Sequence, residues 1–427
     1  MSDSPEKGSP ECTDLLYLAH CAPFPADKGE KFRAHRESRL LARKHKVHLV
    51  CFARNLQEMQ STLAVGSEFA SIHVELLSSK RALAGAALRF AAGGCLNVDF
   101  FSSRRVREHI EQLSKRVRFG AAVAYSLAMV PYVPAGVPYV LDMQDVDSEK
   151  WFQYSRLRWP GFLYAIEARR LRKREVDLAR PAAGTLFTTC PEETLFRSFA
   201  GENLRTASME NGVLFDQFDP AVTPRLAELR GRRFLVFVGT MDYHPNADAV
   251  CWFAESVFPE LRKRDPSLEF FIVGRNPTPE VARLEKMPNI IVTGAVANPG
   301  PYLADALALV APMRIARGIQ NKVLEAIAMS KWSLVSPEVC KCFGEELPWG
   351  IIPCATSADY CEALSRDLST PDPGIREQGR NRFSWETNLQ VFLDEVENAM
   401  RCRSIRKADL NASNGYGTNG SCPERDT

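Results

Sequence analysis

A group of basic side chains, with one glycine and one carboxylate, lies between residues 312 and 329. Arg314, Arg317 and Lys322 supply positive charge, Gly318 precedes an expected helix, and Glu325 lies within it. Cations at a helix start are unfavourable without an anion, because the helix dipole already makes that end positive. A glycine lets an anion approach the first free amides. The pattern therefore predicts a site for a nucleotide diphosphate, with Arg314 and Lys322 on phosphate oxygens and Glu325 on the ribose hydroxyls.

The elements on either side of this group place it at a sheet edge. The continuous apolar run 306–311 is typical of a buried parallel strand, and helical periodicity begins at Val323. The basic loop then follows the carboxyl end of a strand, where open parallel sheets bind ligands. The alternative is an ordinary amphipathic helix that happens to begin with basic residues.

Strand and helix patterns alternate along most of the chain. In the first half we expect strands at 15–19, 47–52, 121–125, 139–142 and 184–188, and helices at 30–44, 104–118 and 161–180. In the second half we expect strands at 234–238, 269–273 and 290–292 and around Leu307 and Leu334. This alternation predicts an α/β protein with two doubly wound parallel-sheet domains.

Composition shifts suggest where the domains begin and end. We expect a disordered N-terminal tail, an N-terminal Rossmann-like domain, a linker, a C-terminal Rossmann-like domain, a last helix and a disordered C-terminal tail. The corresponding ranges are 1–12, 13–215, 216–233, 234–384, 385–402 and 403–427.

Three further stretches, 23–33, 145–151 and 237–248, contain glycine or acidic motifs at expected strand ends. Together with 312–329, in this order, they resemble glycosyltransferase family 4, and the resemblance covers nearly the whole chain except its ends. The similarity is strongest to the subgroup found beside bacterial exopolysaccharide and exosortase (PEP-CTERM) loci. The resemblance implies a retaining enzyme of GT-B fold. Two Rossmann-like domains then face across a cleft, with 13–215 as the acceptor domain and 234–384 as the nucleotide-sugar donor domain, and a C-terminal helix at 385–402 crosses back to the first domain.

The implied activity is metal-independent transfer of a sugar from a UDP- or GDP-sugar to a glycan or lipid-linked acceptor in exopolysaccharide biosynthesis. No cofactor and no metal ion are expected. The expected catalytic residues are Arg314, Lys322 and Glu325. The expected donor contacts are Lys28, Gly29, Gly239, Thr240, Met241, Arg317 and Gly318, and the acceptor candidates are Glu30, Asp145 and Asp147.

Several of these positions have simpler interpretations. Gly239 can form a tight turn with Asn246 capping the next helix, and Asp147 can be a helix cap. The Asp145-Val146-Asp147 sequence also matches the metal-binding signature of the other large glycosyltransferase fold. We discount the metal interpretation, because the motif follows an expected parallel strand and precedes a helix.

The sequence departs from the family pattern at three places. Thr240 and His244 stand about where members carry Arg and Lys, Arg317 replaces a Glu, and the stretch 125–129 lacks the usual His. These departures keep two other functions open: a catalytically weak nucleotide-sugar-binding or assembly subunit, and a GT-B-fold sugar-nucleotide epimerase. A dehydrogenase is disfavoured, since no Gly-x-Gly-x-x-Gly follows an expected strand.

Composition gives weaker constraints. The 427 residues are 45% hydrophobic, the net charge is +2, and neither a membrane-spanning window nor a secretory start is evident. We expect a cytoplasmic enzyme that does not bind nucleic acid. The 12 cysteines are scattered without the spacing of a zinc site. The basic stretch 167–180 suggests peripheral contact with the inner membrane, although a solvated helix face explains it equally well.

Overall fold

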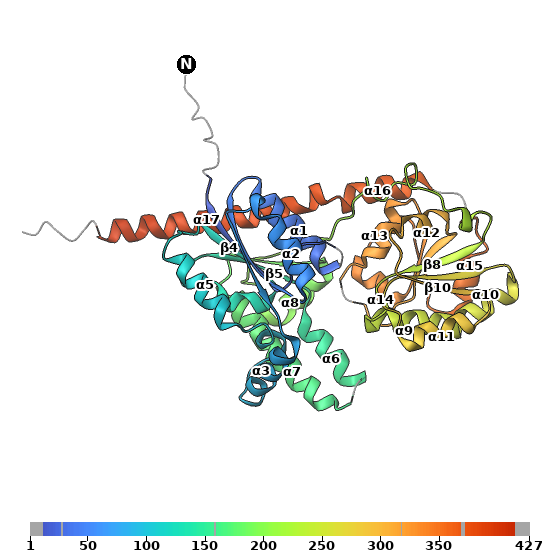
Figure 1. Ribbon diagram of the computed structural model, residues 1–427, viewed down its shortest axis with the longest axis horizontal. Coiled ribbons are helices and arrows are strands. Elements are labelled where there is room, and N and C mark those ends of the chain that lie inside the picture. Colours follow the sequence, from blue (N-terminus) through green and yellow to red (C-terminus); the bar gives the residue numbers. More distant parts are fainter. Residues whose placement is uncertain (1–11, 27–28, 158, 317, 369–371, 415–427) are drawn as a thin grey trace, which may run out of the picture. The chain divides into compact units, whose positions relative to one another are not determined.

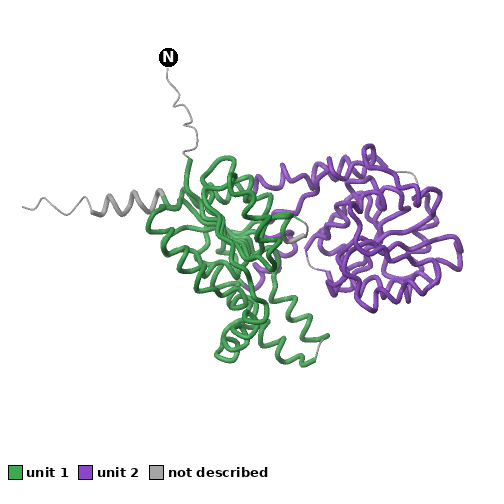
Figure 2. The backbone as a smooth tube through the Cα atoms, in the orientation of Figure 1, with its two compact units in different colours: residues 1–186, 200–207, 392–427 green, residues 187–199, 208–391 purple. Residues whose placement is uncertain are grey.

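The computed structural model describes residues 12–26, 29–157, 159–316, 318–368 and 372–414, with side chains at 29, 30 and beyond 403 left out. The chain forms two compact units (Figures 1 and 2). Unit 1 comprises residues 1–186, 200–207 and 392–427, and unit 2 comprises 187–199 and 208–391. Unit 2 therefore includes the expected linker 216–233.

The first sheet has seven strands in the order β3-β2-β1-β4-β5-β6-β7. Its strands are β1 (Asp14–Ala19), β2 (Lys46–Ala53), β3 (Ser71–Leu76), β4 (Ala121–Tyr125), β5 (Tyr139–Gln144), β6 (Gly184–Phe187) and β7 (Thr206–Ser208). The α-helices in this part of the chain are α1 (Gly29–Ala42), α2 (Leu56–Ala64), α3 (Ser79–Ala91), α4 (Leu96–Asp99), α5 (Arg104–Ser114), α6 (Asp147–Leu157), α7 (Gly161–Ala179) and α8 (Cys190–Ala200). β1 pairs in parallel with both β2 and β4.

The second sheet has six strands in the order β10-β9-β8-β11-β12-β13. Its strands are β8 (Phe234–Val238), β9 (Glu269–Val273), β10 (Ile290–Gly294), β11 (Ala308–Ala311), β12 (Ser333–Val335) and β13 (Ile351–Pro353). The helices are α9 (His244–Trp252), α10 (Phe258–Arg264), α11 (Pro279–Arg283), α12 (Gly300–Asp305), α13 (Asn321–Ala328), α14 (Pro337–Cys340), α15 (Ser357–Ala363), α16 (Pro373–Phe383) and α17 (Trp385–Asn414). α17 contributes residues to both units and is longer than the expected 385–402.

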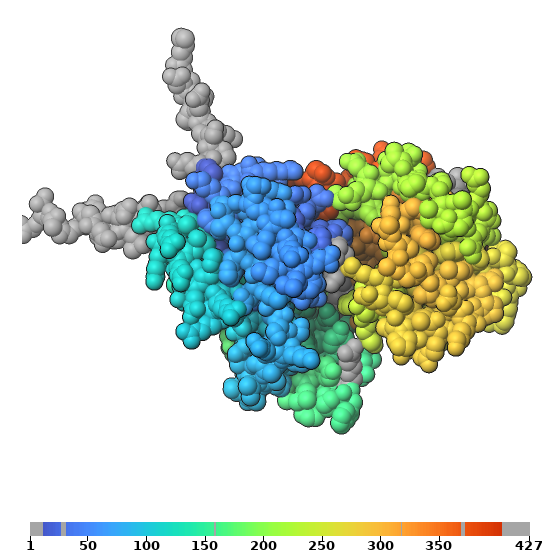
Figure 3. Space-filling view, viewed as in Figure 1, coloured from blue at the N-terminus to red at the C-terminus, as the bar shows by residue number. Residues whose placement is uncertain are grey.

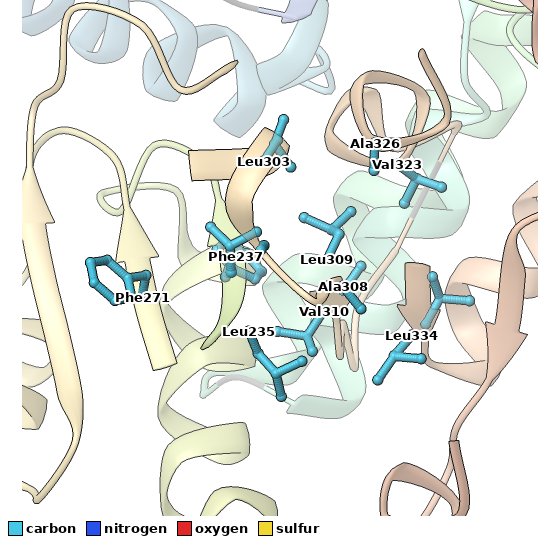
Figure 4. Packing of buried hydrophobic residues seen from close by; sticks show 14 of the residues in the cluster. Leu235, Phe237, Phe271, Leu303, Ala308, Leu309, Val310, Val323, Ala326 and Leu334 are labelled. Carbon is cyan, nitrogen blue, oxygen red and sulfur yellow. The ribbon is translucent and has the colours of Figure 1, made fainter. Parts of the chain in front are cut away.

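The core of unit 2 explains why these residues form buried strands. Strands β8 and β11 consist almost entirely of buried apolar residues, which is typical of a parallel sheet covered on both faces. Figure 4 shows Ala308 and Leu309 of β11 near Val323 and Ala326 of α13. This packing fixes the start of α13 beyond the carboxyl end of β11.

Both sheets reverse their strand order at one point. In each, the first strand along the chain lies beside the fourth, so β1 borders β4 and β8 borders β11. The loops after two such strands leave toward opposite faces of the sheet, and the crevice between them is where open α/β sheets bind ligands. The order confirms the predicted pair of Rossmann-like domains.

Most of the central strands match the expected ones, and the strands that were not predicted lie at sheet edges. Strands predicted at 15–19, 121–125 and 234–238 are present as β1, β4 and β8. The strands β3, β7 and β13 were not predicted, and each occupies an edge. Edge strands are short or half-exposed, so they lack the continuous apolar run that revealed the others.

A buried ion pair holds α1 to the sheet of unit 1. Arg33 on α1 donates two hydrogen bonds to the Asp142 carboxylate on β5, at 2.6 and 3.0 Å. Both side chains are buried. Burial raises the pKa of the neighbouring Glu37 carboxyl well above its usual range, and its repulsion from Asp142 adds to this shift. Tyr17 on β1 donates to Glu37 at 2.8 Å.

We expect Asp142→Ala to lower the free energy of unfolding of unit 1 by about 3–5 kcal/mol, because the buried Arg33 would lose both hydrogen bonds to Asp142 and keep only its 3.2 Å ion pair with Glu37. Urea unfolding combined with hydrogen exchange would locate the loss. Glu108→Ala, which removes the exposed Arg104–Glu108 pair on α5, is the matched control and should leave the transition unchanged. Equal effects of the two substitutions would contradict this account.

Candidate functional site

Two loops of unit 2 meet where its strand order reverses. One follows β8 and leads into α9, and the other follows β11 and leads into α13. Lys322 on α13 donates to Asn246 Oδ1 on α9 at 3.2 Å and to Gln320 Oε1 at 3.3 Å. Asn246 in turn donates from Nδ2 to the Thr240 carbonyl at 2.9 Å. A single chain of hydrogen bonds thus connects the two loops.

Lys322 is a buried cation, and its hydrogen-bond partners among the described residues are neutral. Its side chain is enclosed, with 8% of the residue exposed, and Nζ lies 5.0 Å from the centre of the Phe237 ring. Within the described part of the chain, no carboxylate forms an ion pair with it. Burial lowers the pKa of Lys322 to about 8, although the nearby Glu325 carboxylate acts to raise it. Buried charges are normally paired, so this arrangement calls for an anion from outside the chain.

The beginning of α13 is open to the same anion. Gln320 precedes the helix and its side chain does not cap it. Gly318 has φ +61°, in the left-handed region that glycine tolerates best. Amides at an uncapped helix start and the helix dipole both favour negative charge. Gly318 and Lys322, both predicted to help bind the diphosphate, therefore lie together at the start of α13.

Glu325 lies one helical turn beyond Lys322, on α13. The carboxylate has no hydrogen-bond or ion-pair partner within the described residues. Burial raises its pKa to about 7, while Lys322 acts to lower it. An unpaired, partly buried carboxylate is available to accept hydrogen bonds from hydroxyl groups.

Arg314, the other expected phosphate ligand, is paired within the chain. It is exposed and forms an ion pair with Asp248 on α9, with 2.9 Å between Nε and Oδ2. This pair is a second link between the loops after β8 and β11. Asp248 already neutralises the guanidinium, so Lys322 is better placed than Arg314 to act as an unpaired cation.

Glycines keep the edge of the sheet free of side chains. Gly239 and Gly274 directly follow β8 and β9, and Gly294 ends β10. A Cβ at Gly274 would lie 1.7 Å from the Gly239 carbonyl oxygen, and one at Gly239 would lie 2.7 Å from Asn246 Nδ2. Gly239 therefore leaves room for Asn246 to turn back toward Thr240. Met241, the other expected contact in this turn, is fully buried.

Asn246 corrects one of the simpler interpretations. As a cap it would precede the next helix, but α9 begins at His244 and places Asn246 inside the first turn. Its side chain joins Thr240 to Lys322 instead. Asp248 and Asn246 were not predicted as site residues. The sequence could have indicated them, because both lie in the first turns of the helix that follows the Gly239 turn.

In unit 1, the carboxyl ends of β1 and β4 bring together His20 and Tyr125. Nδ1 of His20 lies 3.2 Å from the Tyr125 carbonyl, and the two rings stack with centres 5.6 Å apart. The family pattern places a histidine after β4, whereas this one follows β1, the strand beside it. Adjacent parallel strands end at the same edge, which sequence order does not reveal.

The remaining predicted residues are only partly described. Lys28 and Arg317 lie outside the described residues, as does the side chain of Glu30, while Gly29 begins α1. Asp145 is half-buried after β5.

Asp147 is the first residue of α6, so it does not precede the helix as a cap would. Its carboxylate accepts a hydrogen bond from Asn97 at 3.3 Å. The next residue, Ser148, is buried and donates its amide and hydroxyl hydrogens to Glu175 at 2.8 and 2.6 Å.

The described residues form neither a metal site nor a membrane span. Within the described ranges, no group of three or more His, Cys, Asp or Glu side chains is arranged to hold a metal ion. None of the helices described here combines the length and apolar content that a membrane crossing requires.

Residues 232–365 match the protein family described as "Glycosyl transferases group 1". This segment begins at β8 and contains both loops of the candidate site. Among curated proteins, no sequence matches the chain.

Three solved structures illustrate the likeness in fold. HepE of Anabaena, in complex with UDP, has 11% identity and a TM-score of 0.61, with 90% of this chain and 100% of HepE covered. A glycosyltransferase from Rickettsia africae has 12% identity, a TM-score of 0.57 and coverages of 91% and 99%. Sucrose-phosphate synthase from Thermosynechococcus elongatus has 12% identity, a TM-score of 0.59 and coverages of 93% and 100%. HepE is also known in complex with UDP-glucose.

At these identities the likeness shows the fold, which is that of GT-B glycosyltransferases. Together with the family match, it supports a glycosyltransferase.

The charge of Lys322 predicts a pH dependence of UDP binding. A lysine with its pKa lowered to about 8 is charged below that pH and neutral above it. We therefore expect the affinity for UDP to fall as pH rises above about 8, approaching tenfold per pH unit. Isothermal titration at several pH values measures this. Lys322→Arg, which stays charged, should bind UDP with nearly constant affinity over the same range; identical profiles for both proteins would rule out Lys322 as the phosphate ligand.

Proposed function

We propose that this protein transfers a sugar from a UDP- or GDP-sugar to a glycan or lipid-linked acceptor, with retention of configuration and without a metal ion. One observation carries the proposal: Lys322 is a buried cation whose described partners are all neutral, and it lies where the β8 and β11 loops meet. A nucleotide diphosphate supplies the missing negative charge. The UDP complexes of HepE, a protein of the same fold, support a nucleotide-sugar as donor.

The chemistry follows from where charge develops. Breaking the bond between the sugar and the diphosphate leaves negative charge on the leaving phosphate oxygen. Lys322 and the amides at the start of α13 would stabilise that charge without moving, because Asn246 and Gln320 already hold the ammonium group. Preorganised donors of this kind lower the barrier more than groups that must reorient. Arg314 and Arg317 would add positive charge around the same loop.

Glu325 would select the nucleoside part of the donor. A carboxylate one turn into a helix that holds the diphosphate at its start lies within reach of the ribose. When ionised, it accepts hydrogen bonds from both ribose hydroxyls. The acceptor hydroxyl would attack from the face that the diphosphate leaves, with a phosphate oxygen taking its proton. Residues of unit 1 would hold the acceptor, and Asp145 and Asp147 remain our candidates for this role.

The stereochemistry of transfer and the biosynthetic pathway are further parts of the proposal. Retention and action in exopolysaccharide biosynthesis rest on the sequence resemblance alone. The replacement of the usual Glu by Arg317 favours a second candidate function, a nucleotide-sugar-binding subunit with weak activity. The two functions differ in turnover and not in donor binding.

Isothermal titration with a panel of UDP- and GDP-sugars in the presence of EDTA tests donor binding. We expect one donor to bind with micromolar affinity and Glu325→Ala to weaken it by about tenfold or more, because the ribose hydroxyls lose a charged acceptor. Binding that needs added Mg²⁺ would contradict metal independence. If none of the donors binds, the proposal fails and only the similarity in fold to glycosyltransferases stands.

Turnover measurements separate the two candidate functions. We expect Lys322→Ala to lower kcat by about 30- to 1,000-fold, which corresponds to about 2–4 kcal/mol in the barrier. Lys263→Ala is the matched control, since Lys263 is exposed on α10 and pairs with Glu260 outside the site. An unchanged kcat in Lys322→Ala would overturn its catalytic role. Donor binding without transfer in the wild-type protein would favour the binding subunit.

A further inference from the structure

Most of the large apolar side chains exposed on unit 1 belong to two neighbouring features. The first is α3, and the second is the tip of the hairpin formed by α6 and α7, which Figures 1 and 3 show projecting at the same end of unit 1. We call them together the apolar surface. It comprises Leu83, Leu88, Leu157, Trp159, Phe162 and Leu163.

Helix α3 is apolar on the face that it presents to solvent. Leu88 is 75% exposed and Leu83 is 59% exposed, and Ala84, Ala87 and Ala91 are exposed between and beside them. Ala86 is the one fully buried residue on the opposite side. An apolar helix face is normally covered by another layer.

Charge on α3 has a single sign. The helix carries Lys80, Arg81 and Arg89, and no acidic residue occurs between Glu75 and Asp99. Lys80 and Arg81 are exposed beside the apolar face. Arg89 pairs with Asp99 at 3.5 Å, which leaves Lys80 and Arg81 as the charges beside the start of the apolar face. An apolar helix face beside two cations is complementary to a surface that is apolar inside and negative outside.

The hairpin tip has the same composition. Trp159 is 93% exposed, and Leu157 and Phe162 beside it are each about two-thirds exposed. Arg156 and Arg169 are exposed on the same two helices. Trp is favoured at the boundary between lipid headgroups and hydrocarbon, because its ring is apolar and its N–H is polar.

The cations of α7 beyond this tip are less available to an external surface, because they bind other parts of unit 1. Arg170 donates to the Phe90 carbonyl and to the Gly94 carbonyl at 3.0 Å, which fastens α7 to the end of α3. Arg172 pairs with Glu149 at 2.6 Å. Glu167 is buried and accepts hydrogen bonds from the start of α4. The basic stretch 167–180 therefore mainly positions α3, α4 and the hairpin.

We infer that the apolar surface docks unit 1 onto a lipid bilayer that contains anionic headgroups. The apolar side chains enter the outer edge of the hydrocarbon, and Lys80, Arg81, Arg156 and Arg169 contact headgroup phosphates. A protein partner with an apolar patch would need acidic residues opposite all of these cations, whereas an anionic bilayer supplies negative charge everywhere. This inference does not depend on the proposed transferase activity.

Vesicle sedimentation of the full chain tests the inference. We expect binding to vesicles of phosphatidylcholine with phosphatidylglycerol, weaker binding to phosphatidylcholine alone, and loss at high salt. The double variants Leu83→Ser/Leu88→Ser and Lys80→Glu/Arg81→Glu should each weaken partitioning by about tenfold or more. Brominated lipid should quench tryptophan fluorescence in the wild type and much less in Trp159→Phe.

Val222→Ser is the matched control, because Val222 is 73% exposed in unit 2 and should not affect partitioning. All substituted residues are exposed, so circular dichroism and thermal midpoints should be unchanged. Absence of wild-type binding to anionic vesicles, or equal binding by all variants, would overturn the inference. Self-association that the same variants abolish, without vesicle binding, would assign the surface to a second copy of the chain and would also overturn it.

Discussion

The hydrogen bond from Lys322 to Asn246 is the constraint on which the candidate site depends. It joins the loops after β8 and β11, the two strands between which the sheet of unit 2 reverses its order. A lysine at this depth would be costly to bury without compensation, and its described partners neutralise none of its charge. Its lowered pKa reflects that cost. The simplest way to satisfy the site is a bound anion, and the open start of α13 offers amides to the same ligand.

Each unit buries a cation beside its sheet, but the partners of the two cations differ. In unit 1 the buried cation Arg33 lies against Asp142 and Glu37, so its charge is compensated within the fold. In unit 2 Lys322 lacks a carboxylate partner among the described residues. The buried Lys331, away from the two loops, donates to the Ala306 carbonyl. The contrast between Arg33 and Lys322 supports our proposal that Lys322 binds a ligand, whereas Arg33 holds α1 in place.

The central strands and the basic loop were predictable from the sequence, because buried parallel strands give continuous apolar runs and cations at a helix start are locally unusual. The edge strands β3, β7 and β13 were not, since a short or half-exposed strand leaves no such run. Three features of the sites arise only from the three-dimensional arrangement. Arg314 is neutralised by Asp248, Asn246 joins the loops from inside α9, and His20 reaches β4 from the neighbouring strand. Each depends on which strands lie side by side, and the chain order alone does not give that information.

A crystal structure of the protein with UDP would test the central claim most directly. The account predicts the diphosphate within hydrogen-bond distance of Lys322 Nζ and the first amides of α13, with the ribose hydroxyls on the Glu325 carboxylate. UDP bound elsewhere, with Lys322 still held only by Asn246 and Gln320, would contradict it.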